Sequence, residues 1–298
     1  MVGYLFAGQG SQYIGMGKDL FEAFPESKAI FETADKVLGF SISELCFNGP
    51  AQELTKTNNC QPAIVTMTIA CWQAYLTKHP QVDGYMAGLS LGEYSALVAA
   101  GALSFEDAVY LVRQRGQFME EEAINHPGKM LSVIGLDLAK VKELCAEVKA
   151  EVANINCPGQ TVISGSPEVI VKAQTLAKEK GAKLAVILEV SGAFHSSFMQ
   201  GASTKLAKAL EKINISKPKF PIICNVTGKS VLDPQEIKQN LIRQVSGSVL
   251  WEDSMKLVLG QGVTNFVEFG PGKVLKGLMR RIDSNAQVAN VEKRADIV

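Results

Sequence analysis

The chain has 298 residues, which is enough for one large domain or for a domain with a smaller one inserted. Its 30 lysines and arginines balance 30 aspartates and glutamates, so no overall basic field would attract nucleic acid or an anionic membrane surface. Hydrophobic residues make up 47% and charged residues 20%, which is typical of a globular protein and excludes a disordered or fibrous one.

The sequence carries no signal for secretion or membrane insertion. The longest nearly apolar stretch, residues 95–105, is shorter than the roughly 18 residues of a transmembrane helix. No basic segment precedes the apolar N-terminus, and Gln9 interrupts it early. The six cysteines form no C-x-x-C pair and have no histidines at metal-ligand spacing. We therefore expect a cytoplasmic protein with reduced thiols, no membrane span and no bound metal.

In chain order, two strand-to-helix units come first. The apolar run at residues 4–7 ends in a Gly-Gln-Gly turn, which is typical of a buried strand that turns into a helix. Residues 62–76 then predict a mostly apolar helix, residues 85–87 a short strand and residues 93–100 a second helix. Strands that alternate with helices predict an α/β fold with a parallel sheet covered on both faces.

Between residues 130 and 190 the pattern changes to the βαββαβ order of a ferredoxin-like unit. The predicted elements are residues 131–134, 138–149, 152–155, 161–164, 167–180 and 184–190. Turn-prone residues flank them on both sides. We predict an inserted small subdomain at residues 126–190 and a large subdomain made of residues 1–125 and 191–298. The strands predicted at residues 222–224 and 266–269 return the chain to the large sheet.

Ser90 stands in Gly88-Leu89-Ser90-Leu91-Gly92, and this G-x-S-x-G pattern between a strand and a helix fits a nucleophile elbow. A sharp turn strains the serine backbone and crowds its neighbours, so glycines two residues before and after avoid clashes. The following helix aims its N-terminal N–H groups at a developing oxyanion. The alternative is a chance match in a glycine-containing loop, but the flanking elements favour a nucleophile.

A serine nucleophile needs a base, and the chain has only three histidines. His79 and His126 each precede a proline in polar surroundings, as in a solvated loop end. His195 follows Gly192-Ala193-Phe194, where small residues would let another segment approach closely. We therefore predict His195 as the general base, with a structural histidine as the alternative.

The chain order disfavours an ordinary lipase or esterase. Those enzymes place an acid between the serine and a histidine near the C-terminus. Here about a third of the chain follows His195. The only acid just before it is Glu189, which the pattern places as a buried residue of a strand.

Residues 105–123 predict a helix that contains two arginines. Its apolar positions define an inward direction, from which Arg115 deviates by about 40° and Arg113 by about 120°. We expect Arg115 to point into the protein and Arg113 into solvent. A buried guanidinium needs a partner, which is either an internal carboxylate or an anionic ligand. A ligand carboxylate would form a bidentate pair and select an acyl group with an acidic tail.

Two glycine-rich loops do not predict nucleotide sites. The loop at residues 8–13 lacks the third glycine of a dinucleotide fingerprint, and the loop at residues 270–273 lacks the first glycine and the Ser/Thr of a P-loop. The first loop can instead present the backbone N–H of Gln9 beside the elbow, as one half of an oxyanion hole.

Several motifs together resemble the malonyl-CoA:acyl-carrier-protein transacylases of fatty-acid and polyketide synthesis. They occur in the order of that family over nearly the whole chain: GQGSQ at 8–12, GLSLGEYSA at 88–96, RG at 115–116, NCPGQ at 156–160, GAFHS at 192–196, RQ at 243–244 and FGPG at 269–272. The resemblance implies an α/β-hydrolase-like large subdomain with a ferredoxin-like insertion, and an active site in the cleft between them.

The resemblance also implies roles for individual residues. Ser90 would be the acylated nucleophile and His195 its base, oriented by the backbone carbonyl of Gln244. The amides of Gln9 and Leu91 would form the oxyanion hole.

Arg115 would bind the malonyl carboxylate. We therefore expect an acyltransferase, an acyl-carrier-protein S-malonyltransferase. It would move a malonyl group from malonyl-CoA through a malonyl-serine ester to the phosphopantetheine thiol of an acyl carrier protein. No cofactor of its own is implied, and we expect a monomer. Because carrier proteins are acidic, we expect a basic docking face at Lys273, Lys276, Arg280 and Arg281.

Three positions depart from the family pattern, although none removes a catalytic group. Leu89 replaces a common histidine, and Ala7 and Ser197 replace prolines. Stand-alone acyltransferases of polyketide assembly lines often look like this too, so a discrete trans-acting enzyme is an alternative. A hydrolytic editor of the same fold is another, but it would not need Arg115. A non-catalytic docking module would not need the Ser–His pair.

Overall fold

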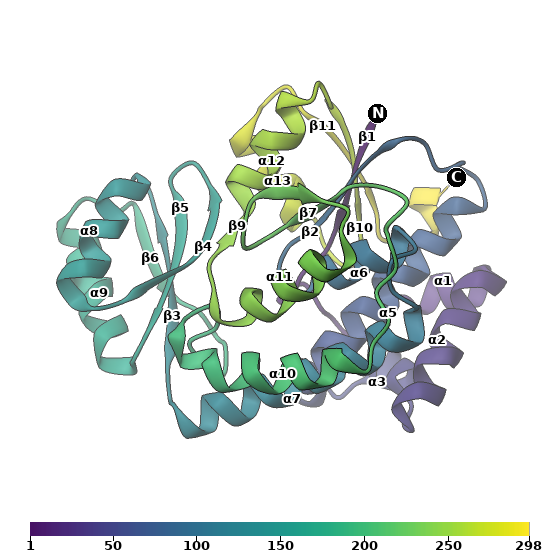
Figure 1. The fold of residues 1–298 in the computed structure, drawn as a ribbon, viewed down its shortest axis with the longest axis horizontal. Coiled ribbons are helices and arrows are strands. Elements are labelled where there is room, and N and C mark those ends of the chain that lie inside the picture. The colour runs from purple at the N-terminus through teal and green to yellow at the C-terminus, as the bar shows by residue number, and fades with distance from the viewer. Residues whose placement is uncertain (298) are drawn as a thin grey trace.

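The computed structural model describes residues 1–297, which form two β-sheets of unequal size (Figure 1). The large sheet has the strand order β11-β10-β1-β2-β7-β8. Its strands are β1 (Val2–Phe6), β2 (Gly84–Gly88), β7 (Ile222–Cys224), β8 (Lys229–Val231), β10 (Asn265–Phe269) and β11 (Gln287–Val291). Neighbours pair in parallel, except that β8 is antiparallel to β7. The predicted parallel sheet is confirmed.

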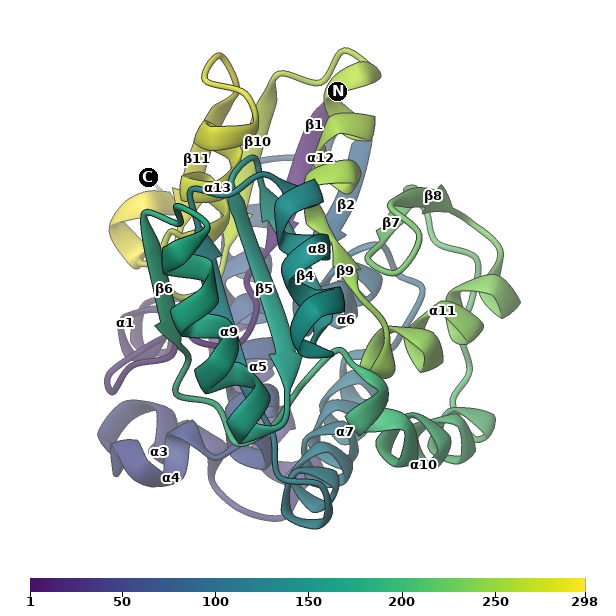
Figure 2. The ribbon, with the colours of Figure 1, turned by 90° about the vertical axis from the view of Figure 1, so that its left-hand side faces the viewer.

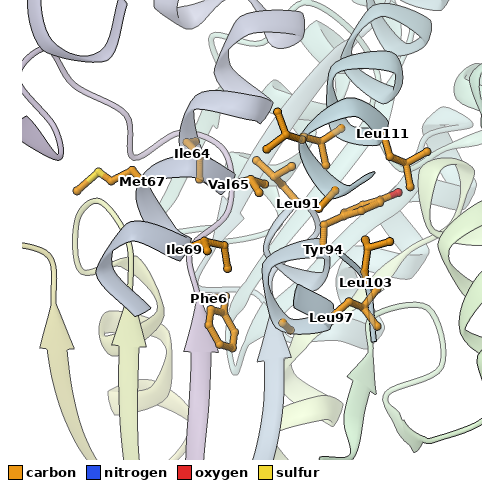
Figure 3. Packing of buried hydrophobic residues seen from close by; sticks show 14 of the residues in the cluster. Phe6, Ile64, Val65, Met67, Ile69, Leu91, Tyr94, Leu97, Leu103 and Leu111 are labelled. Atoms are coloured by element: carbon orange, nitrogen blue, oxygen red, sulfur yellow. The ribbon is translucent and has the colours of Figure 1, made fainter. Parts of the chain in front are cut away.

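Side chains of β1 alternate between two hydrophobic clusters, because a parallel sheet in an α/β fold is buried on both faces. Tyr4 and Phe6 pack with α5 (Thr57–Leu76) and α6 (Gly92–Ala99), and Figure 3 shows Phe6 among side chains of these helices. Leu5 faces the opposite side and packs with α12 (Trp251–Gly260) and α13 (Val274–Ile282). β1 pairs in parallel with β2, with Phe6 opposite Gly88, so the carboxyl ends of the two strands lie side by side.

Among the described residues, seven further helices and two short 3₁₀ turns belong to the part of the molecule that contains the large sheet. They are α1 (Lys18–Ala23), α2 (Pro25–Leu38), α3 (Ile42–Asn48), α4 (Ala51–Thr55), α7 (Phe105–Asn125), α10 (Gln200–Glu211) and α11 (Pro234–Ser246), with short 3₁₀ turns η1 (Ser197–Met199) and η2 (Arg294–Ile297). Among residues 1–297, no helix is long and apolar enough to span a bilayer.

The small sheet has the order β6-β3-β5-β4-β9. Its strands are β3 (Lys129–Ile134), β4 (Glu151–Cys157), β5 (Gln160–Gly165), β6 (Leu184–Ile187) and β9 (Val249–Leu250). The helices α8 (Leu138–Val148) and α9 (Pro167–Glu179) cover its outer face (Figure 2). The predicted βαββαβ order is confirmed. One strand, β9, comes from outside residues 126–190 and pairs in parallel with β4, so the small sheet includes a segment from the later chain. The exact subdomain boundaries stay a prediction.

The prediction for Glu189 is wrong. The strand β6 ends at Ile187, and Glu189 is exposed on the segment that follows. The amide of Val190 donates back to the carbonyl of Leu188, so the chain has left the ladder at this point. The alternating apolar pattern continued past the strand because Leu188 and Val190 pack against the hydrophobic core of the large part.

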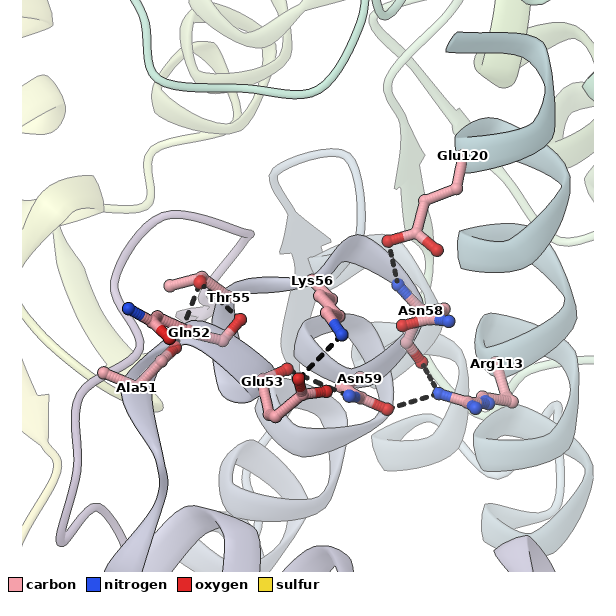
Figure 4. A network of polar contacts seen from close by, with 9 residues as sticks. All are labelled: Ala51, Gln52, Glu53, Thr55, Lys56, Asn58, Asn59, Arg113 and Glu120. Atoms are coloured by element: carbon pink, nitrogen blue, oxygen red, sulfur yellow. Dashed lines mark hydrogen bonds and ion pairs between the residues drawn. The ribbon is translucent and has the colours of Figure 1, made fainter. Parts of the chain in front are cut away.

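The prediction for Arg113 is also wrong, since its side chain is half-buried and not in solvent. The helix α5 begins at Thr57, five residues before the predicted start, and therefore contains Pro62. Proline has no N–H, so it cannot bond the carbonyl four residues earlier, which is that of Asn58. Arg113 Nη1 donates to this carbonyl at 2.6 Å (Figure 4). The side chain compensates for a missing helical hydrogen bond.

Candidate active site

Ser90 lies in the sharp turn between β2 and α6 and has a left-handed backbone, with φ of 51°. A side chain on Gly88 would overlap the backbone of Gly92, and one on Gly92 would overlap the carbonyl of Phe6 in the neighbouring strand. The two glycines are therefore required by packing, and the serine carries a strain that a nucleophile elbow imposes. The predicted elbow is present in the structure.

His195 meets Ser90 from a distant part of the chain. Its Nε2 lies 2.8 Å from Ser90 Oγ, and its Nδ1 lies 2.8 Å from the backbone carbonyl oxygen of Gln244, on α11. Because a carbonyl only accepts, Nδ1 carries the proton and Nε2 is left to accept from the serine. Burial, followed by the nearby charge of Arg115, lowers the pKa of His195 to about 4. The imidazole is therefore neutral at pH 7, as a general base must be.

Arg115 is buried, as predicted from its place on α7, and its guanidinium reaches the same point. Its Nη2 donates to Ser90 Oγ at 3.2 Å and to Gln244 Oε1 at 3.2 Å. Its Nη1 donates to Gln61 Oε1 at 2.9 Å. No carboxylate of residues 1–297 forms a salt bridge with it.

Burial lowers the pKa of the Arg115 guanidinium, and the nearby Tyr94 and Glu93 oppose that shift. Of the two partners considered for a buried guanidinium, the internal carboxylate is absent among direct contacts. Neutral amides orient the cation without neutralising it, which leaves its charge available for an anionic ligand.

A cavity of about 400 Å³ opens onto these three groups and has the size of a small-molecule site. Residues of the small sheet and residues near the carboxyl ends of the large sheet's strands line it. They include Gln9, Leu89, Ser90, Arg115, Met119, Met130, Asn154, Glu189, Phe194 and His195. A larger hollow of about 730 Å³ lies on the outer surface at α9, and none of the three groups lines it. The chemistry is concentrated in the smaller cavity.

The loop at residues 8–13, called the Gln9 loop below, lies directly against the turn that carries Ser90. A side chain on Gly8 would come within 2.5 Å of the Leu89 carbonyl oxygen, so only glycine permits this approach. Within residues 1–297, the backbone N–H groups of Gln9 and Leu91 donate to no protein acceptor. Two unused donors beside a nucleophile are what an oxyanion hole requires.

The sequence patterns did not assign three polar residues to the site, although the structure places them there. Gln61, Glu93 and Asn225 are buried and hydrogen-bond to Arg115, Gln244 and Ser90, respectively. Each is a polar residue inside or beside an apolar run, at positions 57–76, 92–99 and 222–224. That pattern indicates a buried polar group but does not say which partner it meets.

This site and fold define an acyltransferase. Residues 3–295 match the family model described as "Acyl transferase domain". The chain is 46% identical over 287 residues to the malonyl CoA-acyl carrier protein transacylase of Bacillus subtilis, covering 95% of this chain and 90% of that protein. It is 41% identical over 283 residues to the enzyme of the same name from Salmonella typhimurium, covering 94% and 92%.

The solved structures that this fold resembles are of enzymes of the same kind as these relatives. The malonyl CoA-acyl carrier protein transacylase of Clostridium perfringens has a TM-score of 0.95 at 42% identity, covering 99% of this chain and 94% of that one. A malonyl-transacylase solved in complex with its type II PKS acyl-carrier protein has a TM-score of 0.96 at 39% identity, covering 99% and 97%. The chain belongs to the malonyl-CoA:acyl-carrier-protein transacylase family.

Proposed function

We propose that the protein transfers a malonyl group from malonyl-CoA to the phosphopantetheine thiol of an acyl carrier protein through a malonyl ester of Ser90. The observation that carries this proposal is the position of Ser90 Oγ, which lies 2.8 Å from His195 Nε2 and 3.2 Å from Arg115 Nη2. A base and a cation thus meet one nucleophile. The chemistry needs no cofactor of the enzyme's own, and we expect a cytoplasmic monomer.

In the first half-reaction, His195 Nε2 takes the proton of Ser90 Oγ as the oxygen attacks the thioester carbonyl. The carbonyl becomes an oxyanion, which the amides of Gln9 and Leu91 stabilise by about 3–4 kcal/mol per donor. The C–S bond then breaks, and the proton passes from the imidazolium to the sulfur of coenzyme A. Malonyl-Ser90 remains on the enzyme.

In the second half-reaction, the carrier thiol enters the cavity and gives its proton to His195. The thiolate attacks the malonyl ester, the bond from the carbonyl carbon to Ser90 Oγ breaks, and the proton returns to the serine. The backbone carbonyl of Gln244 holds the imidazole in the same tautomer throughout. This carbonyl takes the place of the acid in a Ser-His-Asp triad.

Arg115 would recognise the free carboxylate of the malonyl group. A guanidinium matches a carboxylate in geometry and charge, so the pair selects a malonyl group over an acetyl group, which lacks the second acid. A hydrolytic editor of the same fold would gain nothing from this cation. A non-catalytic docking module would not hold a strained serine against a neutral imidazole.

The carrier protein would dock near the cavity mouth. Lys273, Lys276, Arg280 and Arg281 are exposed on α13 or directly before it. Gly272, two residues before the first residue of α13, lies against Ser11 of the Gln9 loop, which follows β1. A basic face of this kind would attract an acidic carrier protein. The same chemistry serves a fatty-acid carrier or the carrier of a polyketide synthase, and we favour the former.

The test is transfer measured by intact mass. The enzyme is incubated with malonyl-, methylmalonyl- or acetyl-CoA, and a phosphopantetheinylated carrier protein is then added. We expect the carrier to gain a malonyl group in preference to the other two, and Ser90→Ala to abolish transfer. A carrier that stays unmodified while malonyl-CoA is hydrolysed would overturn the proposal in favour of the hydrolytic editor.

A further inference from the structure

Glu93 is a buried carboxyl group that the mechanism above does not use. It lies in the first turn of α6, three residues after Ser90, with 1% of its surface exposed. Its Oε2 accepts a hydrogen bond from Gln244 Nε2 at 2.7 Å and another from the backbone N–H of Asn225 at 3.1 Å. One oxygen therefore joins α6 to α11 and to the loop after β7.

Both residues that donate to Glu93 also hold the catalytic pair. Asn225 Oδ1 accepts from the backbone N–H of Ser90 at 2.5 Å, and its Nδ2 donates to the carbonyl of Gly88 at 2.8 Å. Asn225 thus fixes the strained turn on which the nucleophile stands.

Gln244 makes the contacts on the side of the base. Its backbone carbonyl accepts from His195 Nδ1, its Nε2 donates to the carbonyl of Ser90 at 3.0 Å, and its Oε1 accepts from Arg115 Nη2 at 3.2 Å. The direction of this amide matters. If its nitrogen faced Arg115 instead, two donors would oppose each other.

We propose that Glu93 is a positioning residue, whose Oε2 sets the direction of the Gln244 amide and the place of Asn225, and thereby aligns Ser90, His195 and Arg115. An acceptor at this point forces the nitrogen of Gln244 toward Glu93 and its oxygen toward Arg115. The role needs a hydrogen-bond acceptor and not a negative charge.

The electrostatics agree with an acceptor role. Burial raises the pKa of the Glu93 carboxyl to about 7, although hydrogen bonds from Asn225 and Gln244 oppose the shift. Its second oxygen, Oε1, accepts no hydrogen bond from a nitrogen or a hydroxyl group of the described residues, so a proton can reside there. In either protonation state, Oε2 still accepts from both neighbours.

The test compares Glu93→Gln, which keeps an acceptor oxygen, with Glu93→Met, which has similar length and none. Reactivity of Ser90 is measured with a fluorophosphonate, which phosphonylates an activated serine with loss of fluoride and carries no carboxylate. We expect Glu93→Met to slow phosphonylation by about 10- to 100-fold, the range for a misplaced reacting group. Glu93→Gln should stay within about threefold of the parent, because it retains the hydrogen bonds that position the dyad.

Glu268→Met is the matched control. Glu268 is equally buried and accepts two backbone N–H groups, those of Leu275 and Lys276 at the start of α13. Its replacement should lower the thermal midpoint and leave the phosphonylation rate of the folded enzyme unchanged. A Glu93→Met enzyme that is folded and fully reactive would overturn the proposal, as would equal losses in Glu93→Gln and Glu93→Met.

If Glu93→Met does not fold, Gln244→Met breaks the same link from the other side and leaves the backbone carbonyl for His195. It should slow phosphonylation to a similar extent, and an unchanged rate would overturn the proposal. The inference rests on Ser90 and His195 reacting as in the proposed function. Since phosphonylation needs no malonyl group, failed malonyl transfer alone would remove that function and leave the role of Glu93 standing.

Discussion

Replacing Arg115 with alanine should separate malonyl transfer from acetyl transfer. A malonyl carboxylate bound by the guanidinium would gain two charge-assisted hydrogen bonds, each worth about 1.5–3 kcal/mol. Their loss, about 3–6 kcal/mol, corresponds to a fall of about 10²- to 10⁴-fold in kcat/KM for malonyl-CoA. Acetyl-CoA has no second carboxylate and loses neither bond.

Acetyl transfer should be retained or should improve in Arg115→Ala. In the parent, Arg115 Nη2 donates to Ser90 Oγ at 3.2 Å, and the charge of Arg115 contributes to the lowered pKa of His195. Both effects weaken the nucleophile and its base. Removing them should keep or raise the kcat/KM for acetyl-CoA, while the kcat/KM for malonyl-CoA falls.

The assay measures kcat/KM for both acyl-CoAs with a phosphopantetheinylated carrier protein as acceptor. Arg113→Ala is the matched control, because it removes a guanidinium from the same helix that bonds the Asn58 carbonyl and not the site. It should lower the thermal midpoint and leave the malonyl-to-acetyl ratio unchanged. An unchanged ratio in Arg115→Ala would refute the assignment of Arg115.

Three further predictions follow from the contacts around the site. With His195 titrating at about 4, kcat/KM for malonyl-CoA should fall only as pH drops through that value, and a midpoint near 6.5 would contradict the buried, neutral base. The folded-state pKa of Glu93 is raised from 4.5 to about 7, so its contribution to stability is lost as pH rises through that range. Glu93→Gln should therefore remove about 3 kcal/mol of the pH dependence of the free energy of unfolding. A variant with the same pH dependence as the parent would contradict this. Gln61→Leu removes an acceptor from Arg115 Nη1 and should lower the malonyl-to-acetyl ratio by about tenfold without slowing phosphonylation of Ser90, whereas an unchanged ratio would show that Gln61 does not orient the cation.

Features encoded within a short stretch of chain could be predicted from the sequence. The elbow glycines at 88 and 92 are needed by contacts within a few residues of Ser90 and with the adjacent strand. The βαββαβ order follows from local alternation of strand and helix patterns. The inward direction of Arg115 follows from the helical period alone.

Features that depend on distant partners could not be predicted from patterns. Arg113 is held by the carbonyl that Pro62 leaves free on another helix, and nothing on its own helix shows this. The contribution of Gln244 to His195 is a backbone carbonyl, which has no side-chain signature, so only the family resemblance indicated it. The strand β9 joins the small sheet through a pairing of two residues with β4.

The role of Glu93 also depends on distant partners, although the residue itself lies close to Ser90 in the chain. Its position next to the elbow is local, but its partners lie on α11 and after β7, more than 130 residues away in the chain. The sequence places Glu189 shortly before His195, but Glu93 is more than 100 residues from His195 in the chain. The Glu93 carboxyl contacts the side chain of Gln244, whose backbone carbonyl in turn contacts His195. The fold alone brings these three residues together.

The most direct test of the covalent mechanism is the amount of coenzyme A released when the enzyme meets malonyl-CoA with no carrier protein present. Rapid mixing with a thiol reagent should give a fast burst of one thiol per active site, followed by almost no further release, because malonyl-Ser90 waits for its acceptor. Absence of the burst, or steady release of thiol long after it, would contradict a malonyl-enzyme intermediate that is held for transfer.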